Sequence, residues 1–175
     1  MKHNIPNLKS YITDVPDFPK KGIGFKDITS LLESPEATDR CLELLLSELK
    51  NKQIDKVVAI ESRGFFFGML LAKSLKVPFV PVRKPGKLPR KVITQSFDLE
   101  YGSDVLELHQ DAISPGDKIL IHDDVLATGG TAEAVCKMVE SLGGQIMQCN
   151  FIMKLDFLEG FKKIESYPIF AAVSY

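Results

Sequence analysis

Cysteine is scarce in this sequence, and the few cysteines lie far apart. The 175 residues contain three, Cys41, Cys136 and Cys149, with no Cys-x-x-Cys pair. An odd number of widely spaced cysteines argues against a disulfide framework and against a structural zinc site. We therefore expect a protein that works in a reducing compartment.

A large net charge and long apolar runs are also lacking. The formal net charge is −1 at pH 7, so nothing global favours binding to nucleic acid or to an anionic membrane. No apolar run approaches the roughly 20 residues that span a bilayer. The start, MKHNIPNLKS, has no apolar signal core. These absences predict a cytoplasmic protein with no nucleic-acid partner and no membrane partner.

The composition that remains is that of an ordinary globular protein. Hydrophobic residues make up 45% of the chain and charged residues 26%, which excludes a disordered chain. No repeat, low-complexity segment or linker divides the sequence. We therefore expect a single domain over residues 1–175.

Strand-like and helix-like segments alternate along most of the chain. The expected strands are 56–60, 77–82, 118–123, 145–153 and 169–173, and the expected helices are 4–14, 35–50, 65–75 and 131–142. This alternation predicts an α/β fold, a mainly parallel sheet with helices on both faces. Ligands bind outside the carboxyl ends of such strands, so the loops at 61–64 and 123–131 are expected to lie at the site.

Residues 83–108 break this alternation. Apolar residues at 97, 99 and 101 alternate with polar ones, and Gly102-Ser103 offers a turn. This pattern predicts a two-stranded flap. A long insertion without a helix inside a compact domain is more often a functional lid than packing.

The most informative stretch runs from residue 119 to residue 131. A hydrophobic strand leads to two acids and then to the residues Ala127, Thr128, Gly129, Gly130 and Thr131. Glycines let backbone amides approach a ligand closely, and the first turn of a helix carries unpaired N–H groups and a partial positive charge. We therefore expect this loop to hold a phosphate group. It matches neither a Walker loop nor the Gly-x-Gly-x-x-Gly fingerprint.

The two acids, Asp123 and Asp124, narrow the class of ligand. Carboxylates beside a phosphate site repel a bare anion. They suit a ligand whose sugar hydroxyls donate hydrogen bonds to them, or a divalent cation nearby. A ribose 5-phosphate offers both a phosphate dianion and a vicinal diol, so it fits this stretch.

Basic residues concentrate in one segment of this nearly neutral chain. Five of the nine residues at 83–91 are Lys or Arg, and a pyrophosphate group with magnesium would explain the cluster. The basic residues expected to bind pyrophosphate are Arg63, Arg83, Lys84 and Lys87. A solvated basic loop is the alternative interpretation, and it is the one favoured for Arg90 and Lys91.

Several motifs resemble those of the type I phosphoribosyltransferases. The hydrophobic strand, Asp-Asp and Ala-Thr-Gly-Gly-Thr that end at residue 131 resemble the family's phosphoribosyl pyrophosphate signature. The motifs at 22–29, 61–65, 82–89 and 99–102 keep the family's order and are similar to those of its adenine-specific members. The resemblance covers residues 16 to about 160.

This resemblance implies an activity and a set of ligands. The implied reaction transfers the phosphoribosyl group of phosphoribosyl pyrophosphate to adenine, giving AMP and pyrophosphate, with Mg²⁺ as cofactor. It implies that Asp123 and Asp124 hold the ribose hydroxyls and a hydrated Mg²⁺. It also implies that Glu61 and Ser62 belong to a pyrophosphate-binding loop, often with a non-proline cis peptide. A homodimer is implied as well.

The same resemblance implies a base-binding hood over residues 1–34 and a flexible flap over 83–108. Phe25 is the best candidate to stack on adenine, with Leu155 over the other face, although core packing explains both residues equally well. Lys26 departs from the family pattern, in which arginine is common. Catalytic roles are implied for Glu100 on the flap, as the proton-handling acid, and for Arg63.

Two alternatives remain open from the sequence. One is a transferase of the same class that acts on another purine, although the motifs at 82–89 and 99–102 favour adenine. The other is a non-catalytic regulator that senses phosphoribosyl pyrophosphate and binds nucleic acid. The net charge of −1 and the lack of a helix-turn-helix pattern argue against the regulator.

Overall fold

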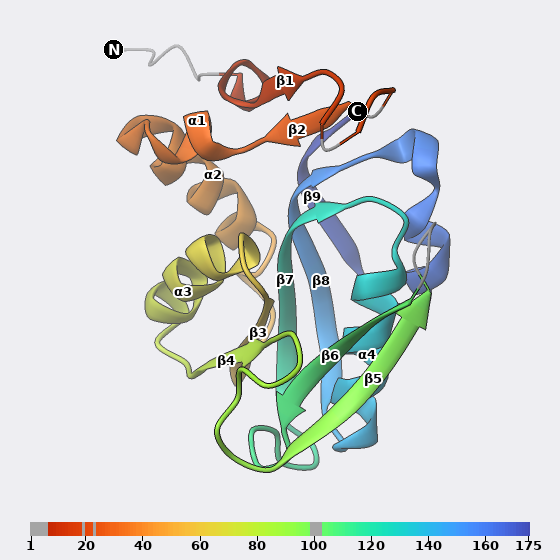
Figure 1. Ribbon diagram of the computed structural model, residues 1–175. Helices are drawn as coiled ribbons and strands as arrows, with labels where there is room; N and C mark the ends of the chain where they lie inside the picture. Colours follow the sequence, from red (N-terminus) through yellow and green to blue (C-terminus); the bar gives the residue numbers. More distant parts are fainter. Residues whose placement is uncertain (1–6, 19, 23, 99–102) are drawn as a thin grey trace. The chain divides into compact units, whose positions relative to one another are not determined.

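The structure is a computed structural model that describes residues 7–18, 20–22, 24–98 and 103–175 (Figure 1). The chain divides into two compact units, Met1–Leu44 and Leu45–Tyr175.

The first unit holds short elements only. They are a 3-10 helix η1 (Leu8–Tyr11), strands β1 (Thr13–Val15) and β2 (Phe25–Asp27), helix α1 (Thr29–Leu32) and the beginning of α2 (Pro35–Ser47). The expected helix over 4–14 is confirmed only in part: among the described residues a 3-10 helix covers Leu8–Tyr11, but Thr13–Val15 pair antiparallel with Phe25–Asp27. A short amphipathic spacing was outweighed by strand pairing, as often happens for segments this short.

Helix α2 matches its sequence pattern more closely. It begins at Pro35, where the fixed φ of proline suits the first helical turn, and it ends at Ser47, three residues before the expected end. Cys41 and Leu45 on its apolar face are fully buried. Periodic apolar residues therefore located this helix well.

The second unit is built on a five-stranded parallel sheet. The strands are β3 (Lys56–Ile60), β4 (Phe79–Val82), β7 (Lys118–Leu126), β8 (Gln145–Lys154) and β9 (Ile169–Ser174). Their order is β4-β3-β7-β8-β9, and every neighbouring pair is parallel. The expected α/β fold with a mainly parallel sheet is confirmed.

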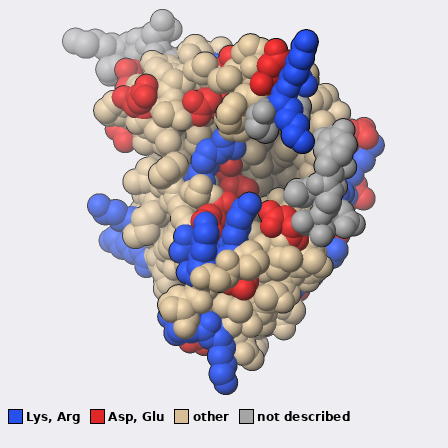
Figure 2. All heavy atoms as spheres, viewed as in Figure 1, with Lys and Arg blue, Asp and Glu red and all other residues tan. Residues whose placement is uncertain are grey.

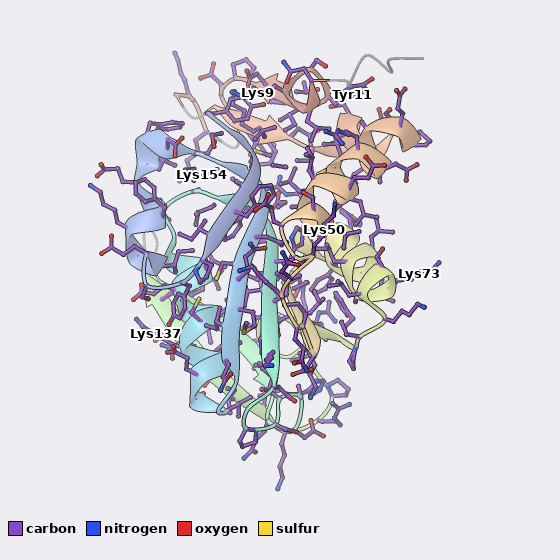
Figure 3. All side chains as sticks on the ribbon, turned by 180° about the vertical axis from the view of Figure 1, so that it is seen from behind. Lys9, Tyr11, Lys50, Lys73, Lys137 and Lys154 are labelled. Atoms are coloured by element: carbon purple, nitrogen blue, oxygen red, sulfur yellow. The ribbon has the colours of Figure 1, made fainter. Side chains whose placement is uncertain are left out.

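Two helices cover opposite faces of this sheet. Helix α3 (Gly64–Leu75) connects β3 to β4, and α4 (Gly130–Ser141) connects β7 to β8. The two connections run in opposite directions along the sheet, so right-handed crossovers place the helices on opposite faces. Figure 1 shows this arrangement, and in Figure 3 Lys73 on α3 and Lys137 on α4 project outward on the two sides.

The reversal of strand order lies between β3 and β7. In open α/β sheets, ligands bind at the carboxyl ends of the strands where the order reverses. The loops that follow β3 and β7 begin at residues 61 and 127. The topology therefore brings together the two loops that the sequence singled out.

The flap is an antiparallel hairpin. Strand β5 (Val92–Asp98) pairs with β6 (Ser103–His109) in continuous register, which confirms the two-stranded prediction. The expected turn at residue 102 lies outside the described residues. Leu106 and Leu108 of β6 are buried in the hydrophobic core that also contains the inner face of α4. In the part of the chain that the structure describes, no helix is long and apolar enough to span a bilayer.

Candidate active site

A hollow of about 400 Å³ opens where the loops after β3 and β7 meet (Figure 2). Figure 2 shows acidic atoms in its depth and basic side chains beside it. Its lining includes most of the residues expected from the sequence: Glu61, Ser62, Arg63, Lys84, Asp123, Asp124, Ala127, Thr128, Gly129 and Thr131. Residues far apart in the chain thus converge on one hollow.

The loop after β7 has the shape expected for phosphate binding. Gly129 adopts a left-handed φ of 78° and is the N-cap of α4, without a side-chain cap hydrogen bond. The first N–H groups of a helix have no partner within the helix, and the end carries a partial positive charge. Thr131 lies in the first turn of α4 and lines the hollow. The segment 127–131 can therefore accept a phosphate dianion.

Gly160 packs against this loop, and the sequence did not predict this contact. A Cβ on Gly160 would lie 2.0 Å from the carbonyl oxygen of Ala127 and 2.6 Å from the amide nitrogen of Gly129. A Cβ on Gly129 would lie 2.1 Å from the carbonyl oxygen of Gly160. Only two glycines allow this close backbone packing. An isolated glycine after β8 was visible in the sequence, but no local pattern indicated that it packs against residue 127.

The paired acids lie at the end of β7 beside Arg63. Asp124 is 4% exposed, and its Oδ2 lies 2.6 Å from Nε of Arg63. The Oδ1 of Asp123 accepts a hydrogen bond from the backbone N–H of Asp124 at 2.9 Å. The loop after β3 and the end of β7 are therefore joined by an ion pair in the floor of the hollow.

Burial raises the pKa of both acids. Burial raises the pKa of Asp123 well above its usual range, and the neighbouring Asp124 carboxylate raises it further. Burial also raises the pKa of Asp124, although the Arg63 guanidinium opposes this. Two neighbouring carboxylates beside a single guanidinium carry an excess of negative charge. Such a pair suits hydroxyl donors or a cation better than a bare anion.

These acids also fit a hydrated magnesium ion. Among the described residues, no group of three or more His, Cys, Asp or Glu side chains forms a cluster that could enclose a metal. Mg²⁺ keeps several waters and is often held through one or two carboxylates plus substrate phosphates. Asp123 and Asp124 in the floor of the hollow match that donor set.

The loop after β3 carries the expected unusual peptide. The bond between Glu61 and Ser62 is a non-proline cis peptide, so this expectation is confirmed. Arg63 follows as the residue before α3, and Gly64 begins the helix. A Cβ on Gly64 would lie 2.7 Å from Oδ1 of Asp123, so a larger residue there would have to displace the Asp123 side chain.

The basic segment contacts this loop through Glu61. Lys84 lines the hollow, whereas Arg83 and Lys87 reach the Glu61 carboxylate, Arg83 with its Nη2 at 3.3 Å from Oε1. Asp104 on β6 pairs with Lys84 at 3.2 Å. The lining also includes the flap residues Phe97, Asp104 and Leu106, which sequence reasoning did not single out. Their alternation along the flap strands was the available signal.

The structure records local contacts for the residues expected to bind the base. In the first unit, Phe25 packs its ring edge-on against Phe18 at 5.0 Å between centroids, and Lys26 pairs with Asp14. In the second unit, Leu155 follows β8 and donates its N–H to the carbonyl of Leu126 at 3.0 Å. Their role in base binding stays a prediction. Glu100 lies outside the described residues, and Gly130 is the first residue of α4.

Comparison with known proteins shows which family this chain belongs to. A profile of the phosphoribosyl transferase domain matches residues 27–169. The adenine phosphoribosyltransferase of Flavobacterium johnsoniae is 62% identical over 168 residues, covering 96% of this chain and 99% of that protein.

Solved structures agree with the sequence comparison. The adenine phosphoribosyltransferase of Thermoanaerobacter pseudethanolicus superimposes with a TM-score of 0.94 at 48% identity, over 96% of this chain and 98% of that one. The Saccharomyces cerevisiae enzyme, complexed with an imino-altritol bisphosphate and adenine, gives a TM-score of 0.90 at 40% identity over 94% and 95% of the two chains.

Proposed function

The chain belongs to the phosphoribosyltransferase family, and we propose that it transfers the phosphoribosyl group of phosphoribosyl pyrophosphate to N9 of adenine. The products are AMP and pyrophosphate, so the reaction salvages a purine base. One observation carries the proposal: the Gly129 turn at the start of α4 lies beside Asp123, Asp124 and Arg63 in a single hollow. The adenine phosphoribosyltransferases similar to this chain support the choice of base.

The sugar phosphate is held at the carboxyl end of β7. The amides and hydroxyls of 127–131 bind the 5-phosphate, because the helix end provides N–H donors and a positive dipole. Asp123 and Asp124 accept hydrogen bonds from the ribose hydroxyls. These contacts fix the ribose so that its anomeric carbon faces the incoming base.

The leaving group is held by the cations. Arg63, Arg83, Lys84 and Lys87 neutralise the charge that grows on pyrophosphate as its bond to the anomeric carbon breaks. Asp123 and Asp124 would hold Mg²⁺ through water, and the ion supplies further neutralisation of pyrophosphate charge when bound. Closure of the 83–108 flap excludes water that would otherwise hydrolyse the activated sugar.

The base is bound by the hood of residues 1–34, acting with the rest of the chain as one domain. Phe25 and Lys26 are the hood residues that we expect to contact adenine, and Leu155 is expected to contact it as well. Glu100 manages the N9 proton from the flap. Changing Glu100→Ala should lower kcat more than it raises KM for phosphoribosyl pyrophosphate; an effect on KM alone would make Glu100 a substrate clamp.

The experiment is an assay of purified protein with each nucleobase, phosphoribosyl pyrophosphate and Mg²⁺, with nucleotide products separated by chromatography. We expect AMP from adenine and at most traces of IMP or GMP from the other purines. Preferential use of hypoxanthine or guanine would refute adenine as the substrate while leaving the transferase chemistry in place. Formation of no nucleotide from any base would refute the enzyme activity.

We also propose a homodimer. On α3, Phe66 and Met69 are 51% and 54% exposed and lie three residues apart, so they share one face of the helix. Exposed large apolar side chains that are grouped mark interaction surfaces. Phe66→Glu should shift the mass measured by light scattering from dimer to monomer; a monomeric unmodified protein would overturn the proposal.

A cytoplasmic location is proposed with it. All three cysteines are buried and none forms a disulfide. The Sγ atoms of Cys136 and Cys149 are 3.7 Å apart, too far for a disulfide bond. Buried cysteines without disulfides are typical of proteins that work in a reducing compartment. Cell fractionation followed by detection of the protein tests this location.

A further inference from the structure

The Glu61 carboxylate has three partners in one short segment of chain. Its Oε2 accepts a hydrogen bond from the backbone N–H of Lys84 at 3.0 Å. Its Oε1 lies 3.3 Å from Nη2 of Arg83 and also accepts a hydrogen bond from Nζ of Lys87. The side chain of Glu61 is only 9% exposed. One nearly buried carboxylate thus holds the segment 83–87 on the loop that follows β3.

Glu61 is ionised in this environment. Burial by itself raises its pKa, but the hydrogen bonds from Lys87, the backbone of Lys84 and Arg83 outweigh burial and lower the pKa to about 2. An ionised carboxylate repels the phosphate oxygens of a pyrophosphate group. Its chemistry therefore suits the cations that bind pyrophosphate and not the pyrophosphate itself.

A different acid fixes the backbone of the same segment. Arg83 and Glu107 exchange two backbone hydrogen bonds, of 2.9 and 2.7 Å. The N–H of Gly86 donates to Oε2 of Glu107 at 3.0 Å. Glu107 therefore holds the path of the backbone to strand β6. Glu61, in contrast, contacts the charged ends of the Arg83 and Lys87 side chains and so places their charges.

The two charges held by Glu61 differ in their freedom to move. The side chain of Lys87 is 45% exposed, and that of Arg83 is 33% exposed. Arg83 has a second contact, from Nη1 to the carbonyl oxygen of Lys87 at 3.2 Å. Lysine is a compact charge on a flexible stem, whereas the planar guanidinium of arginine binds in a fixed geometry. Lys87 can thus leave the carboxylate more easily than Arg83.

We propose that Glu61 is a positioning residue for the pyrophosphate-binding cations. It gathers Arg83 and Lys87 beside the 61–63 loop before the substrate arrives, and Lys87 then exchanges the carboxylate for a pyrophosphate oxygen. Like charges crowded at 83–91 repel one another, and Glu61 offsets this repulsion in the ligand-free protein. This inference rests on the proposed function and deepens it, because it separates a residue that organises the site from the residues that bind.

The test compares a ligand that has pyrophosphate with one that lacks it. Glu61→Gln keeps the size of the side chain and an acceptor for the Lys84 N–H but removes the charge. We expect the KM for phosphoribosyl pyrophosphate and the Kd for magnesium pyrophosphate to rise about tenfold. The Kd for AMP should stay within about twofold, and kcat should change less than KM. Glu61→Asp, which restores the charge, should recover part of the loss.

Asp111→Asn is the matched control. Asp111 is an exposed acid of the same unit that pairs with Arg90 at 3.1 Å, so the substitution removes one negative charge away from the hollow. It should leave both dissociation constants and the KM unchanged. Equal losses in Asp111→Asn and Glu61→Gln would overturn the proposal, because net charge alone would then account for the effect.

Two further results would overturn it. A KM that falls or stays constant in Glu61→Gln would mean that the carboxylate competes with pyrophosphate or has no part in its binding. Equal weakening of AMP and pyrophosphate would mean general damage to the site. The binding of pyrophosphate by calorimetry needs no turnover, so it tests the role of Glu61 even if adenine proves not to be the substrate.

Discussion

At the scale of single residues, the site depends on how charges are paired. Asp124 is almost completely buried, yet its carboxylate has the Arg63 guanidinium 2.6 Å away. Removing one member of a buried ion pair leaves the other uncompensated. The sequence indicated both residues as ligands of one substrate, but their direct contact with each other appears only in the structure.

Changing Asp124→Asn removes the carboxylate that pairs with Arg63 and that we propose accepts hydrogen bonds from ribose. A hydrogen bond to a charged group contributes about 1.5–3 kcal/mol, so kcat/KM should fall by about 10- to 100-fold. Steady-state assays of AMP formation measure this, with Asp111→Asn as the control for lost charge. Undiminished turnover in a folded Asp124→Asn protein would remove Asp124 from the mechanism.

At the scale of elements, the start of α4 depends on a partner distant in the chain. The carbonyl of Ala127 and the amide of Gly129 pack against Gly160, which begins the 3-10 helix η3 (Gly160–Ile164). The sequence predicted the glycine turn and the helix to within one residue, because glycine conformation and apolar periodicity are local properties. It did not predict the support from residue 160, because no local pattern encodes which distant backbone lies next to a loop.

Changing Gly160→Ala places a Cβ 2.0 Å from the Ala127 carbonyl, so the 127–129 loop must shift. A displacement of roughly 1 Å in a positioning element can lower the rate about 100-fold, and we expect a loss of that size in kcat/KM for phosphoribosyl pyrophosphate. Glu165→Ala, at an exposed site in the same region, is the control. A melting temperature recorded on the same samples separates unfolding from the predicted effect, and normal kcat/KM in Gly160→Ala would contradict it.

At the scale of the whole molecule, stability depends on a polar pair inside the sheet. His122 on β7 is fully buried, and its Nδ1 lies 2.7 Å from Oδ1 of Asn150 on β8. Burial lowers the pKa of His122 from 6.5 to about 4, although the hydrogen bonds to Asn150 oppose this. The imidazole is therefore neutral in the folded protein at physiological pH.

This pairing predicts how stability depends on pH. Below pH 6.5 the unfolded chain takes up a proton at His122, whereas the folded chain does so only near pH 4. Stability contributed by this group is therefore complete above pH 6.5 and falls by about 3 kcal/mol as the pH drops to 4. Urea unfolding at pH 7, 6 and 5 should show a shallower decline in His122→Gln than in the unmodified protein. Parallel declines would show that His122 does not titrate as described.

The sequence by itself determined the α/β fold and the glycine turn after β7. Each rests on neighbouring residues or on motifs whose meaning is local. Tertiary structure alone decided that Glu61 holds Arg83, Lys84 and Lys87, since these contacts join residues 22 to 26 positions apart across two strands. A one-dimensional pattern shows that an acid and a basic cluster exist. Only the folded backbone brings their charges within hydrogen-bonding distance. This contact is the basis for our proposal that Glu61 positions the cations that bind pyrophosphate.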